Sequence, residues 1–318
     1  MIVFVAGHPS VDRLYEVPHV TPGHIHRPSL VRVVPGGKGL NAARVARRLG
    51  GDPHVLGVLA GHAGRWIAEA LAAENVEGTF AWTDGETRTS VSVAATREPD
   101  GLLTGFYEDS APIPPAAWAE LEAAVYELRP NTEMVCLSGS LMPGAPVDGY
   151  RRIVELAHAR EIPVAIDSHG PPLLEALQAG PELVKLNAEE AAEALAFTPP
   201  DSEVLRWAAG AAAELQRRVP GNRIVVVTCG TSGMVLVDGS GEALGGSIDE
   251  ISRYPVGSGD AVLASLALSS LRCTPAPEML ALALAAGAAS AEVPGPGILE
   301  AARIPALAAR ASIAPVAV

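Results

Sequence analysis

Between residues 115 and 228, short apolar segments alternate with longer segments that have the periodicity of amphipathic helices. The apolar segments are rich in β-branched residues and are bounded by polar residues or glycine, which predicts buried strands. Strands that alternate with helices indicate a parallel sheet with helices on both faces. This pattern constrains the fold most, because parallel strands need helical crossovers and burial on both sides.

The same periodicities assign elements along the whole chain. We expect strands at 2–6, 13–17, 30–34, 54–60, 133–137, 163–167, 182–186, 223–228 and 247–251. We expect helices at 38–49, 64–73, 115–128, 147–160, 171–178, 188–196, 202–218, 259–271 and 277–291. Hairpins are predicted at 88–107, with a turn at Pro99-Asp100-Gly101, and at 233–244.

The segment 88–107 alternates polar and apolar residues, unlike the rest of the chain, which predicts antiparallel strands with one wet and one covered face. Together with the strands near 13–34, it would form a small accessory sheet. We expect this sheet, within about 12–35 and 88–108, to act as a lid over one end of the main sheet. No repeat, linker or break in composition divides the 318 residues, so we expect one α/β domain.

Composition and charge argue against several classes of protein. The formal net charge is -13 and no basic run occurs, which argues against nucleic-acid binding. The apolar stretches 261–271 and 279–291 are shorter than the ~20 residues that span a membrane. No secretory leader is visible, so we expect a cytoplasmic protein. The three cysteines are far apart in the sequence, which predicts neither disulfides nor a metal site. We expect them to pack as small apolar side chains: Cys136, Cys229 and Cys273.

The segment Val256-Gly257-Ser258-Gly259-Asp260 precedes the apolar run 261–268. The glycines allow a tight turn that exposes N–H groups, and the run predicts a buried helix whose N-terminus attracts an anion. A carboxylate in its first turn suits a base that deprotonates a hydroxyl beside a phosphate. The alternative is a glycine-rich turn that Asp260 caps.

A second glycine cluster, Pro35-Gly36-Gly37-Lys38-Gly39-Leu40-Asn41-Ala42, brings backbone, a cation and an amide together. It fits either a ligand site or a tight strand-to-helix turn. Gly37-x-Gly39-x-x-Ala42 also fits a loose dinucleotide fingerprint, but no acidic residue follows at the expected distance. It is not a Walker loop, because Gly39 follows the lysine where Ser or Thr is required.

Further candidates lie where predicted strands end, which in open α/β sheets is the ligand-binding edge. These are Asp167, Lys185, Asn187 and Thr228-Cys229-Gly230-Thr231-Ser232-Gly233. Asn187 and Glu190 can face one ligand and suit Mg²⁺ through water, or they form an N-cap with a first-turn glutamate. The segment 228–233 suits a nucleotide or an ordinary hairpin turn.

Two isolated charges are also candidates. Asp12 can accept hydrogen bonds from sugar hydroxyls, and Arg88 can bind a phosphate through two parallel bonds. Taken alone, each is more typical of a solvated surface charge.

Taken together, these segments resemble the PfkB carbohydrate-kinase family, which has a ribokinase-like fold. Gly36-Gly37-Lys38-Gly39-x-Asn41-x-Ala43 is similar to one family signature, and Val256 to Asp260 to the other, with Ser258 where alanine is usual. Lys185-Leu186-Asn187-Ala188-Glu189-Glu190 resembles the family's Lys-Pro-Asn-x-x-Glu segment. The resemblance covers nearly the whole chain. It implies a three-layer α/β/α domain with a mostly parallel sheet and a small β lid.

Within the family, the chain looks most like the branch that phosphorylates sugar phosphates, which includes 1-phosphofructokinase and tagatose-6-phosphate kinase. Pro9-Ser10-Val11-Asp12-Arg13 and Ser138-Gly139-Ser140-Leu141-Met142-Pro143-Gly144 resemble segments of that branch, and Arg88 matches its phosphate-binding arginine. His8 and Ser90 stand where asparagine is usual, at positions that border the sugar pocket.

The resemblance implies an ATP- and Mg²⁺-dependent kinase. The sugar hydroxyls would be oriented by Asp12, Gly37 and Asn41, and the sugar's phosphate would be bound by Lys38, Arg27 and Arg88, with Ser138 also at the substrate. Asp260 would be the general base, and the N–H groups of Gly257, Ser258 and Gly259 would stabilise the transferring phosphoryl group. The nucleotide site would include Lys185, Asn187, Thr228, Gly230, Gly233, Gly257 and Gly259, with Mg²⁺ held through water near Asn187 and Glu190.

Alternative functions remain. The nearest is a kinase of an unphosphorylated sugar or a nucleoside, which would not need Arg88. More distant are a nicotinamide-dependent oxidoreductase built on Gly37-x-Gly39 and a sugar- or nucleotide-sensing module without catalysis. The resemblance also implies pairing of lids between two subunits, so we expect a homodimer.

Overall fold

The computed structural model describes residues 1–98, 103–197, 202–221, 223–250 and 253–318. Its main sheet contains β1 (Ile2–Ala6), β4 (Pro53–Ala60), β5 (Glu77–Thr83), β8 (Met134–Ser138), β9 (Val164–Asp167), β10 (Leu183–Asn187), β11 (Ile224–Thr228), β12 (Met234–Val237), β13 (Ala243–Ser247) and β14 (Ser312–Pro315). Their order is β14-β13-β12-β11-β10-β9-β8-β1-β4-β5. From β5 to β11 all neighbours are parallel, and β12 to β14 extend the edge in antiparallel fashion. The predicted mostly parallel sheet is confirmed.

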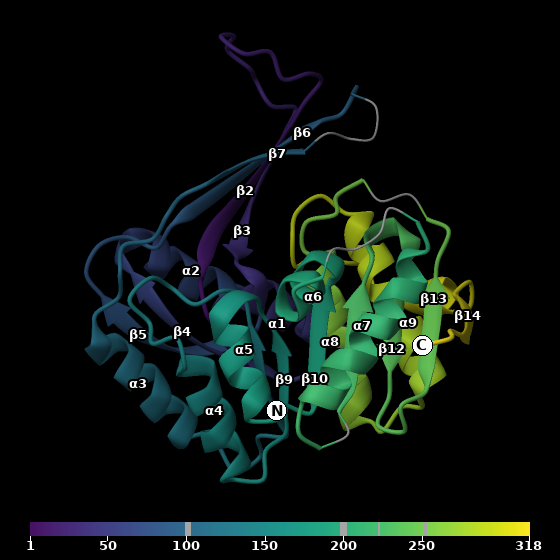
Figure 1. Cartoon of the computed structure of the whole chain (residues 1–318). Helices are drawn as coiled ribbons and strands as arrows, with labels where there is room; N and C mark the ends of the chain where they lie inside the picture. The colour runs from purple at the N-terminus through teal and green to yellow at the C-terminus, as the bar shows by residue number, and fades with distance from the viewer. Residues whose placement is uncertain (99–102, 198–201, 222, 251–252) are drawn as a thin grey trace.

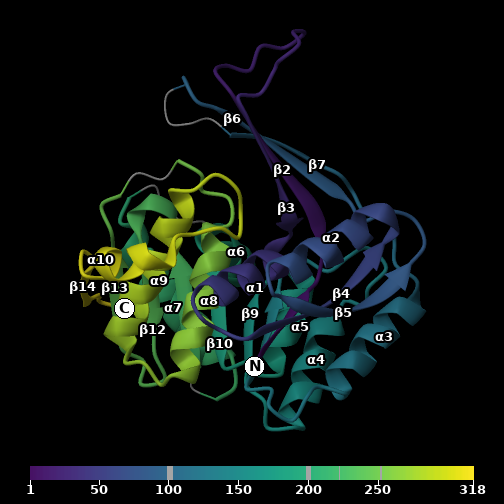
Figure 2. The ribbon, with the colours of Figure 1, turned by 180° about the vertical axis from the view of Figure 1, so that it is seen from behind.

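Helices cover both faces of this sheet (Figures 1 and 2). One layer contains α3 (Pro115–Tyr126), α4 (Gly149–His158), α5 (Gly170–Gln178), α6 (Ala188–Leu195) and α7 (Val204–Arg218). The other contains α1 (Lys38–Arg48), α2 (Gly61–Ala73), α8 (Ser258–Leu271), α9 (Ala276–Ala291) and α10 (Ile304–Ala308). The fold is therefore the predicted three-layer α/β/α arrangement.

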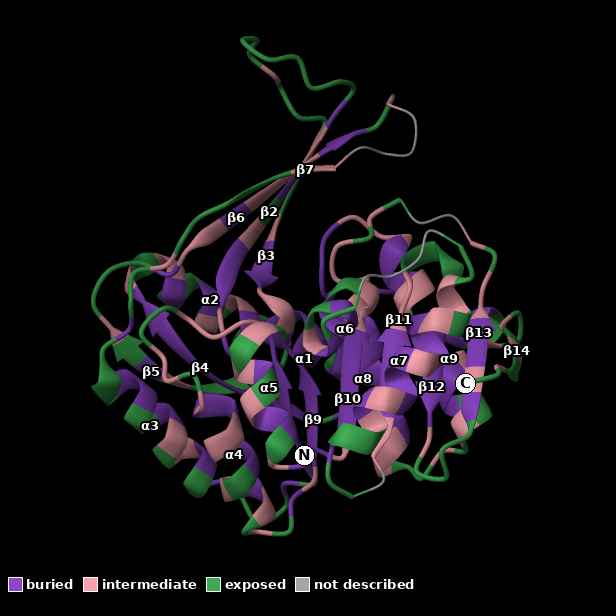
Figure 3. Ribbon diagram, in the orientation of Figure 1, coloured by how far each residue is buried: buried purple, intermediate pink, exposed green. Residues whose placement is uncertain are grey.

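Each face of the sheet has its own hydrophobic core. In β1, Val3 and Val5 pack toward one core, whereas Ile2 and Phe4 pack toward the other. Because successive side chains of a strand point to opposite faces, a strand buried on both sides is apolar throughout. The buried central strands are visible in Figure 3. This double burial explains the continuous apolar segments in the sequence.

A second, four-stranded sheet rises from the edge where the parallel strands of the main sheet end (Figure 1). Its strands are β2 (Ser10–Val17), β3 (Leu30–Gly36), β6 (Thr89–Ala95) and β7 (Leu103–Tyr107), in the order β3-β2-β6-β7. We call it the small sheet. The β2–β3 and β6–β7 pairs are antiparallel as predicted, but β2 and β6 pair in parallel. The turn predicted at Pro99-Asp100-Gly101 lies outside the described residues.

Several predictions about local structure were wrong or incomplete. Strand β5 was not predicted, because this edge strand is largely exposed and lacks a continuous apolar pattern. Neither α10 nor β14 was predicted, since both are short. The strand expected at 247–251 is not formed at 248–250, because β13 already ends at Ser247. Cys136 is buried as expected, but Cys273 is exposed. In the described part of the chain, no helix combines the length and apolar character needed to cross a membrane.

Candidate active site

A cavity of about 510 Å³ lies between the small sheet and the main sheet's ligand-binding edge. Strands β2 and β6 line one side, and the start of α8 lines the other. Helix α1 contributes Lys38 and Asn41, while β10 contributes Lys185. The cavity therefore brings together residues from both glycine clusters, which are far apart in the sequence, as their positions at strand ends predict.

The turn before α8 depends on glycine. Gly257 has a φ of 91°, and a Cβ atom there would lie 2.8 Å from the Cα of Pro296. A Cβ atom on Gly259 would lie 2.9 Å from the Lys185 Nζ. These glycines let a second loop and a lysine ammonium approach the first turn of α8. The helix dipole and the first-turn N–H groups make this a favourable place for an anion.

Asp260 lies in that first turn, lines the cavity, and is only 5% exposed. Its Oδ2 accepts a hydrogen bond of 2.9 Å from the Asn41 Nδ2. Burial raises the pKa of Asp260 from about 3.8 to about 7, and the negative charge of Asp167 contributes in the same direction. A carboxylate with a pKa near neutrality can take a proton from a hydroxyl and release it again.

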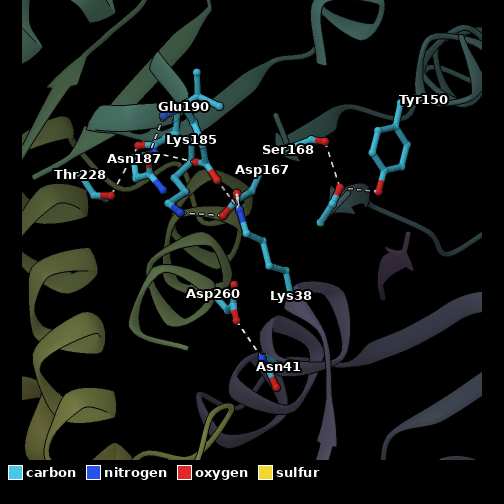
Figure 4. A network of polar contacts seen from close by, with 12 residues as sticks. Lys38, Asn41, Tyr150, Asp167, Ser168, Lys185, Asn187, Glu190, Thr228 and Asp260 are labelled. Atoms are coloured by element: carbon cyan, nitrogen blue, oxygen red, sulfur yellow. Dashed lines mark hydrogen bonds and ion pairs between the residues drawn. The ribbon is translucent and has the colours of Figure 1, made fainter. Parts of the chain in front are cut away.

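Asp167 connects two lysines at the C-terminal end of β9 (Figure 4). Its Oδ1 is 2.8 Å from the Lys38 Nζ, and its Oδ2 is 2.6 Å from the Lys185 Nζ. Lys38 also lies 2.6 Å from Glu190 Oε1. These ion pairs fix two ammonium groups at the cavity. One belongs to Lys38 at the start of α1, and the other belongs to Lys185 in β10 of the main sheet.

The pKa values in this network reflect competition between burial and pairing. Burial raises the pKa of Asp167, but the two lysine charges lower it, and the net direction is downward. Burial lowers the pKa of Lys38, but Asp167 and Glu190 raise it, and the net direction is upward. The ion pairs therefore keep these partners charged in a place where water is scarce.

Asn187 and Glu190 form the capping arrangement that the sequence left as an alternative to a metal site. The Glu190 N–H donates to the Asn187 Oδ1, and the Asn187 N–H donates to the Glu190 Oε2, both over 2.8 Å. Because the other Glu190 oxygen accepts from Lys38, the carboxylate is engaged on both sides. Among the described residues, no group of three or more His, Cys, Asp or Glu side chains is arranged to hold a metal ion.

The opposite side of the cavity suits a sugar. Asp12 lines it from β2 and accepts a 2.6 Å hydrogen bond from the Ser10 Oγ. A Cβ atom on Gly36 would lie 2.0 Å from the Asp12 carboxyl carbon, so glycine is required where the chain turns toward α1. The Asn41 Oδ1 is buried and has no hydrogen-bond partner among the described residues. With Asp12 and Asn41 in its lining, this side presents polar side chains to ligand hydroxyls.

Arg88 lines the same side and has spare donors. Its Nη2 donates to the His8 carbonyl oxygen over 3.3 Å, whereas its buried Nε has no hydrogen-bond partner in the described structure. His8 is held between Ser110 and Ser140, at 2.6 and 3.3 Å. Burial, followed by the charge of Arg88, lowers the pKa of His8 to about 4, so it is neutral at physiological pH. His8 thus holds Arg88 in place through its carbonyl oxygen and does not line the cavity, whereas Ser90 does.

A second cavity of about 200 Å³ adjoins the first, and both are lined by Thr228, Gly230, Pro255, Ser258 and Gly259. Its wall is largely apolar and includes Met234, Ile248, Val262, Leu284 and Ala288. Gly233 also lines it, with a φ of 108° at the end of the turn 230–232. The predicted nucleotide residues therefore surround two connected cavities, one of which suits a flat apolar ring.

Three predicted contacts are not formed as expected. Arg27 is exposed in loop 18–29, which projects from the far end of the small sheet (Figure 1). Ser138 is completely buried at the end of β8 and is absent from the lining of the cavity. The N–H of Ser258 donates to the Pro255 carbonyl oxygen over 3.2 Å, so the turn already uses it. Loop direction keeps Arg27 away from the cavity and burial keeps Ser138 out of its lining, whereas Ser258 lines both cavities with its N–H already bonded.

Other residues of the site were not singled out from the sequence. Ser10, Ser92, Tyr107 and Tyr254 line the cavity, and Asp167 organises its lysines. Asp167 was noted only as one of several residues at strand ends. Tyr254 and Pro296 come from irregular loops that carry no recognisable pattern, so no sequence signal identified them.

Comparison with known proteins agrees with this site. Residues 3–302 match the family model described as pfkB family carbohydrate kinase. This chain belongs to that family. Both glycine clusters, the Lys185 segment and the cavity they surround lie inside the matched region.

The similarity to individual members of the family is moderate in sequence identity. The chain is 30% identical to a tagatose-6-phosphate kinase of Staphylococcus epidermidis over 62% of this chain and 63% of that protein, so the match spans less than two thirds of the relative. It is 30% identical to a 1-phosphofructokinase of Rhodobacter capsulatus over 83% of this chain and 82% of the relative. The crystal structure of phosphofructokinase-2 from Escherichia coli in complex with fructose-6-phosphate has a TM-score of 0.85 and 26% identity, and covers 97% of this chain and 98% of that chain.

We expect the Asp260→Asn substitution to stabilise the folded pfkB-family chain at alkaline pH. Because the folded-state pKa is about 7 and the ordinary value is about 3.8, protonation of Asp260 favours the folded state. That contribution is complete below about pH 4 and is lost as the pH rises through 7. At pH 8 the ionised carboxylate lowers the free energy of unfolding by an amount on the order of a few kcal/mol, because a difference of one pKa unit corresponds to about 1.4 kcal/mol.

Urea unfolding of both proteins at several pH values measures this effect. The free energy of unfolding of Asp260→Asn should exceed that of the wild type at pH 8, and the gap should close near pH 4. Asp249→Asn, at an exposed carboxylate, is the control and should show no such gap. A less stable Asp260→Asn protein at pH 8 would mean that the ionised carboxylate is stabilised by its partners.

Proposed function

We propose that this protein is an ATP-dependent kinase that phosphorylates a sugar phosphate, of the 1-phosphofructokinase or tagatose-6-phosphate kinase type. One observation carries the proposal. A single cavity contains the buried carboxylate of Asp260. On one side of this carboxylate lie an arginine and groups that can bind hydroxyls, and on the other side lie two lysines at a helix N-terminus. The names of the related proteins support the same chemistry.

On the substrate side, Asp12 and Asn41 line the cavity and orient the sugar hydroxyls, and the Gly37 backbone allows the ring to approach. Arg88 binds the phosphate already on the sugar, because this arginine lines the cavity and carries a positive charge there. A charged donor beside an anion forms a strong hydrogen bond in a partly dry site. The substrate is a phosphorylated ketohexose in this proposal.

Asp260 accepts the proton from the sugar hydroxyl that attacks the terminal phosphate of ATP. Its raised pKa suits this role, because the group ionises near neutral pH and remains basic enough to bind the proton. Negative charge on the transferring group is stabilised by the N-terminus of α8 and by Lys185. Lys38, which shares Asp167 with Lys185, also reaches this side; its predicted contact with the phosphate on the sugar stays a prediction.

The second cavity holds the base of the nucleotide, because its wall is apolar and it opens beside Gly230 and Gly259. Asn187 and Thr228 are paired at the ends of β10 and β11, and both line the first cavity. The carboxylates of Asp167 and Glu190 are both paired with lysine, so direct ligation of Mg²⁺ does not fit them. Asn187 and Glu190 would hold Mg²⁺ only through water molecules of its hydration shell, and the ion would reduce the negative charge of the ATP phosphates.

Two alternatives receive less support. A nicotinamide-dependent oxidoreductase would need the glycine loop to follow a strand of the parallel sheet, but Gly37 follows β3 of the small sheet. A kinase of unphosphorylated sugars or nucleosides is chemically closer, and Arg88 distinguishes it. A cytoplasmic location stays a prediction from the sequence.

We expect release of ADP with phosphorylated ketohexoses and little with the free sugars. In the Arg88→Gln variant, the KM for the sugar phosphate should rise by roughly 10- to 100-fold, the scale of a lost hydrogen bond to a charged group. The KM for ATP should stay unchanged. The control variant Arg97→Gln alters an exposed arginine just after β6 and should behave as the wild type.

A coupled assay of ADP release over a panel of sugars and sugar phosphates gives the answer. Turnover of free sugars alone, with no effect of Arg88→Gln, would favour the unphosphorylated-substrate kinase. Ligand binding without ADP release would contradict catalysis and support a sensing role.

We further propose a homodimer through the small sheet. Its outward face carries exposed apolar side chains: Phe106 is 63% and Val31 56% exposed. A groove on this face is lined by Tyr15, Val17, Val20, His26, Pro28, Val31 and Val93. Strand pairing explains why the two faces of the small sheet differ. Asp12 and Ser90 are paired and lie on the face toward the cavity, whereas Tyr15 and Val93 are paired and lie on the outward face. A second copy of the same sheet is the simplest partner for such a face.

We expect Val31→Glu and Phe106→Glu each to shift the protein from dimer to monomer. A buried carboxylate without a partner is strongly unfavourable in an apolar interface. Light scattering coupled to size-exclusion chromatography measures the mass in solution. Tyr126→Glu, which alters an exposed aromatic residue on α3, is the control and should remain dimeric. A wild-type protein that is monomeric at all concentrations would contradict the proposal.

A further inference from the structure

Arg44, in the second turn of α1, is the largest side chain that the fold buries completely, with 1% exposure. It does not line either cavity. A guanidinium in such a place is costly unless each donor finds a partner. Its contacts therefore indicate what the fold uses it for.

The Nη1 group of Arg44 joins two loops that are far apart in the sequence. It donates to the Pro35 carbonyl oxygen over 3.1 Å and to the Pro296 carbonyl oxygen over 3.0 Å. The remaining donors, Nε and Nη2, pair with Glu74 at 2.9 and 2.7 Å. Glu74 caps the end of α2 and is also held by Arg48. The carboxylate thus orients the guanidinium, and Nη1 is left to bridge the loops.

The two bridged carbonyls belong to opposite sides of the cavity. Pro35 precedes Gly36 and Gly37, whose turn lies against Asp12 on the sugar side. Pro296 lies against Gly257, at the turn that begins α8. Gly297 is itself required there, since a Cβ atom on it would be 2.7 Å from the Arg44 Nη1. One nitrogen atom therefore fixes the distance between the sugar-side turn and the phosphoryl-side turn.

We propose that Arg44 is a positioning residue that holds the sugar-side turn and the α8 turn at the separation needed for phosphoryl transfer. The inference rests on the proposed kinase function. Arginine suits the task because its planar fork offers several donors in fixed directions, whereas lysine is a single point charge on a flexible stem. An error of about 1 Å in the relative position of two reactants costs on the order of 10²-fold in rate.

The test compares Arg44→Lys with Arg47→Lys, which alters an exposed arginine on the same helix. Hydrogen exchange of the ligand-free proteins is measured first. In Arg44→Lys, the hydrogen-bonded amides at 36–37, at 258 and at 261 should exchange roughly tenfold faster, because a hydrogen bond from a charged donor to each turn is lost. Amides of the central strands β1 and β8 should keep their protection, and Arg47→Lys should match the wild type.

Steady-state kinetics of the same proteins give the second readout. For Arg44→Lys, kcat should fall at least tenfold, while the KM values for ATP and for the sugar phosphate change less than about threefold. Unchanged exchange at either turn, or a uniform rise that includes the central strands, would overturn the proposal. So would a fall in kcat that only matches the fraction of unfolded protein.

If Arg44→Lys does not fold, Glu74→Gln replaces it, since it keeps the guanidinium but removes the carboxylate that orients it. The same segments should then exchange faster, and wild-type exchange there would overturn the proposal. The exchange measurements need no substrate. A wild-type protein without kinase activity would therefore refute the proposed function, while the exchange data would still decide whether Arg44 holds the two turns.

Discussion

The ion pairs of Asp167 organise the rest of the site. Both oxygens of this completely buried carboxylate are occupied by lysine ammonium groups, one from α1 and one from β10. The resulting network places two positive charges beside a second buried acid, Asp260, and Asp167 helps to keep the pKa of that acid near neutrality. Without this arrangement the cavity would hold neither a stable phosphate-binding side nor a carboxylate able to act as a base at physiological pH.

Much of the fold and site could be predicted from the sequence, because the responsible signals are local. The continuous apolar segments reflect burial on both faces of the main sheet, as β1 shows through its alternate packing into two cores. Gly257 and Gly36 occupy positions where any side chain would collide with Pro296 or Asp12, so the glycine clusters indicated the turns of the site. Parallel strands then bring their ends to one edge, which explains why separated motifs meet.

The remainder depends on contacts that sequence spacing does not reveal. Arg27 lies in the loop that joins β2 to β3, two strands of the small sheet, yet this loop projects away from the cavity (Figure 1). Asn187 and Glu190 satisfy one another as a helix cap, the alternative that their spacing favoured, although the same spacing also fitted a metal site. Arg44 was not distinguished from its exposed neighbour Arg47, because only the folded chain brings Pro35, Pro296 and Glu74 around it.

In the proposed reaction, Asp260 is the group that takes the proton from the attacking hydroxyl. The decisive measurement is the turnover number of Asp260→Asn at pH 8 with a saturating sugar phosphate and ATP, on protein shown to be folded. Loss of a general base predicts a fall of at least ~10²-fold. A turnover number equal to that of the wild type would contradict the account, because the chemistry would then proceed without this carboxylate.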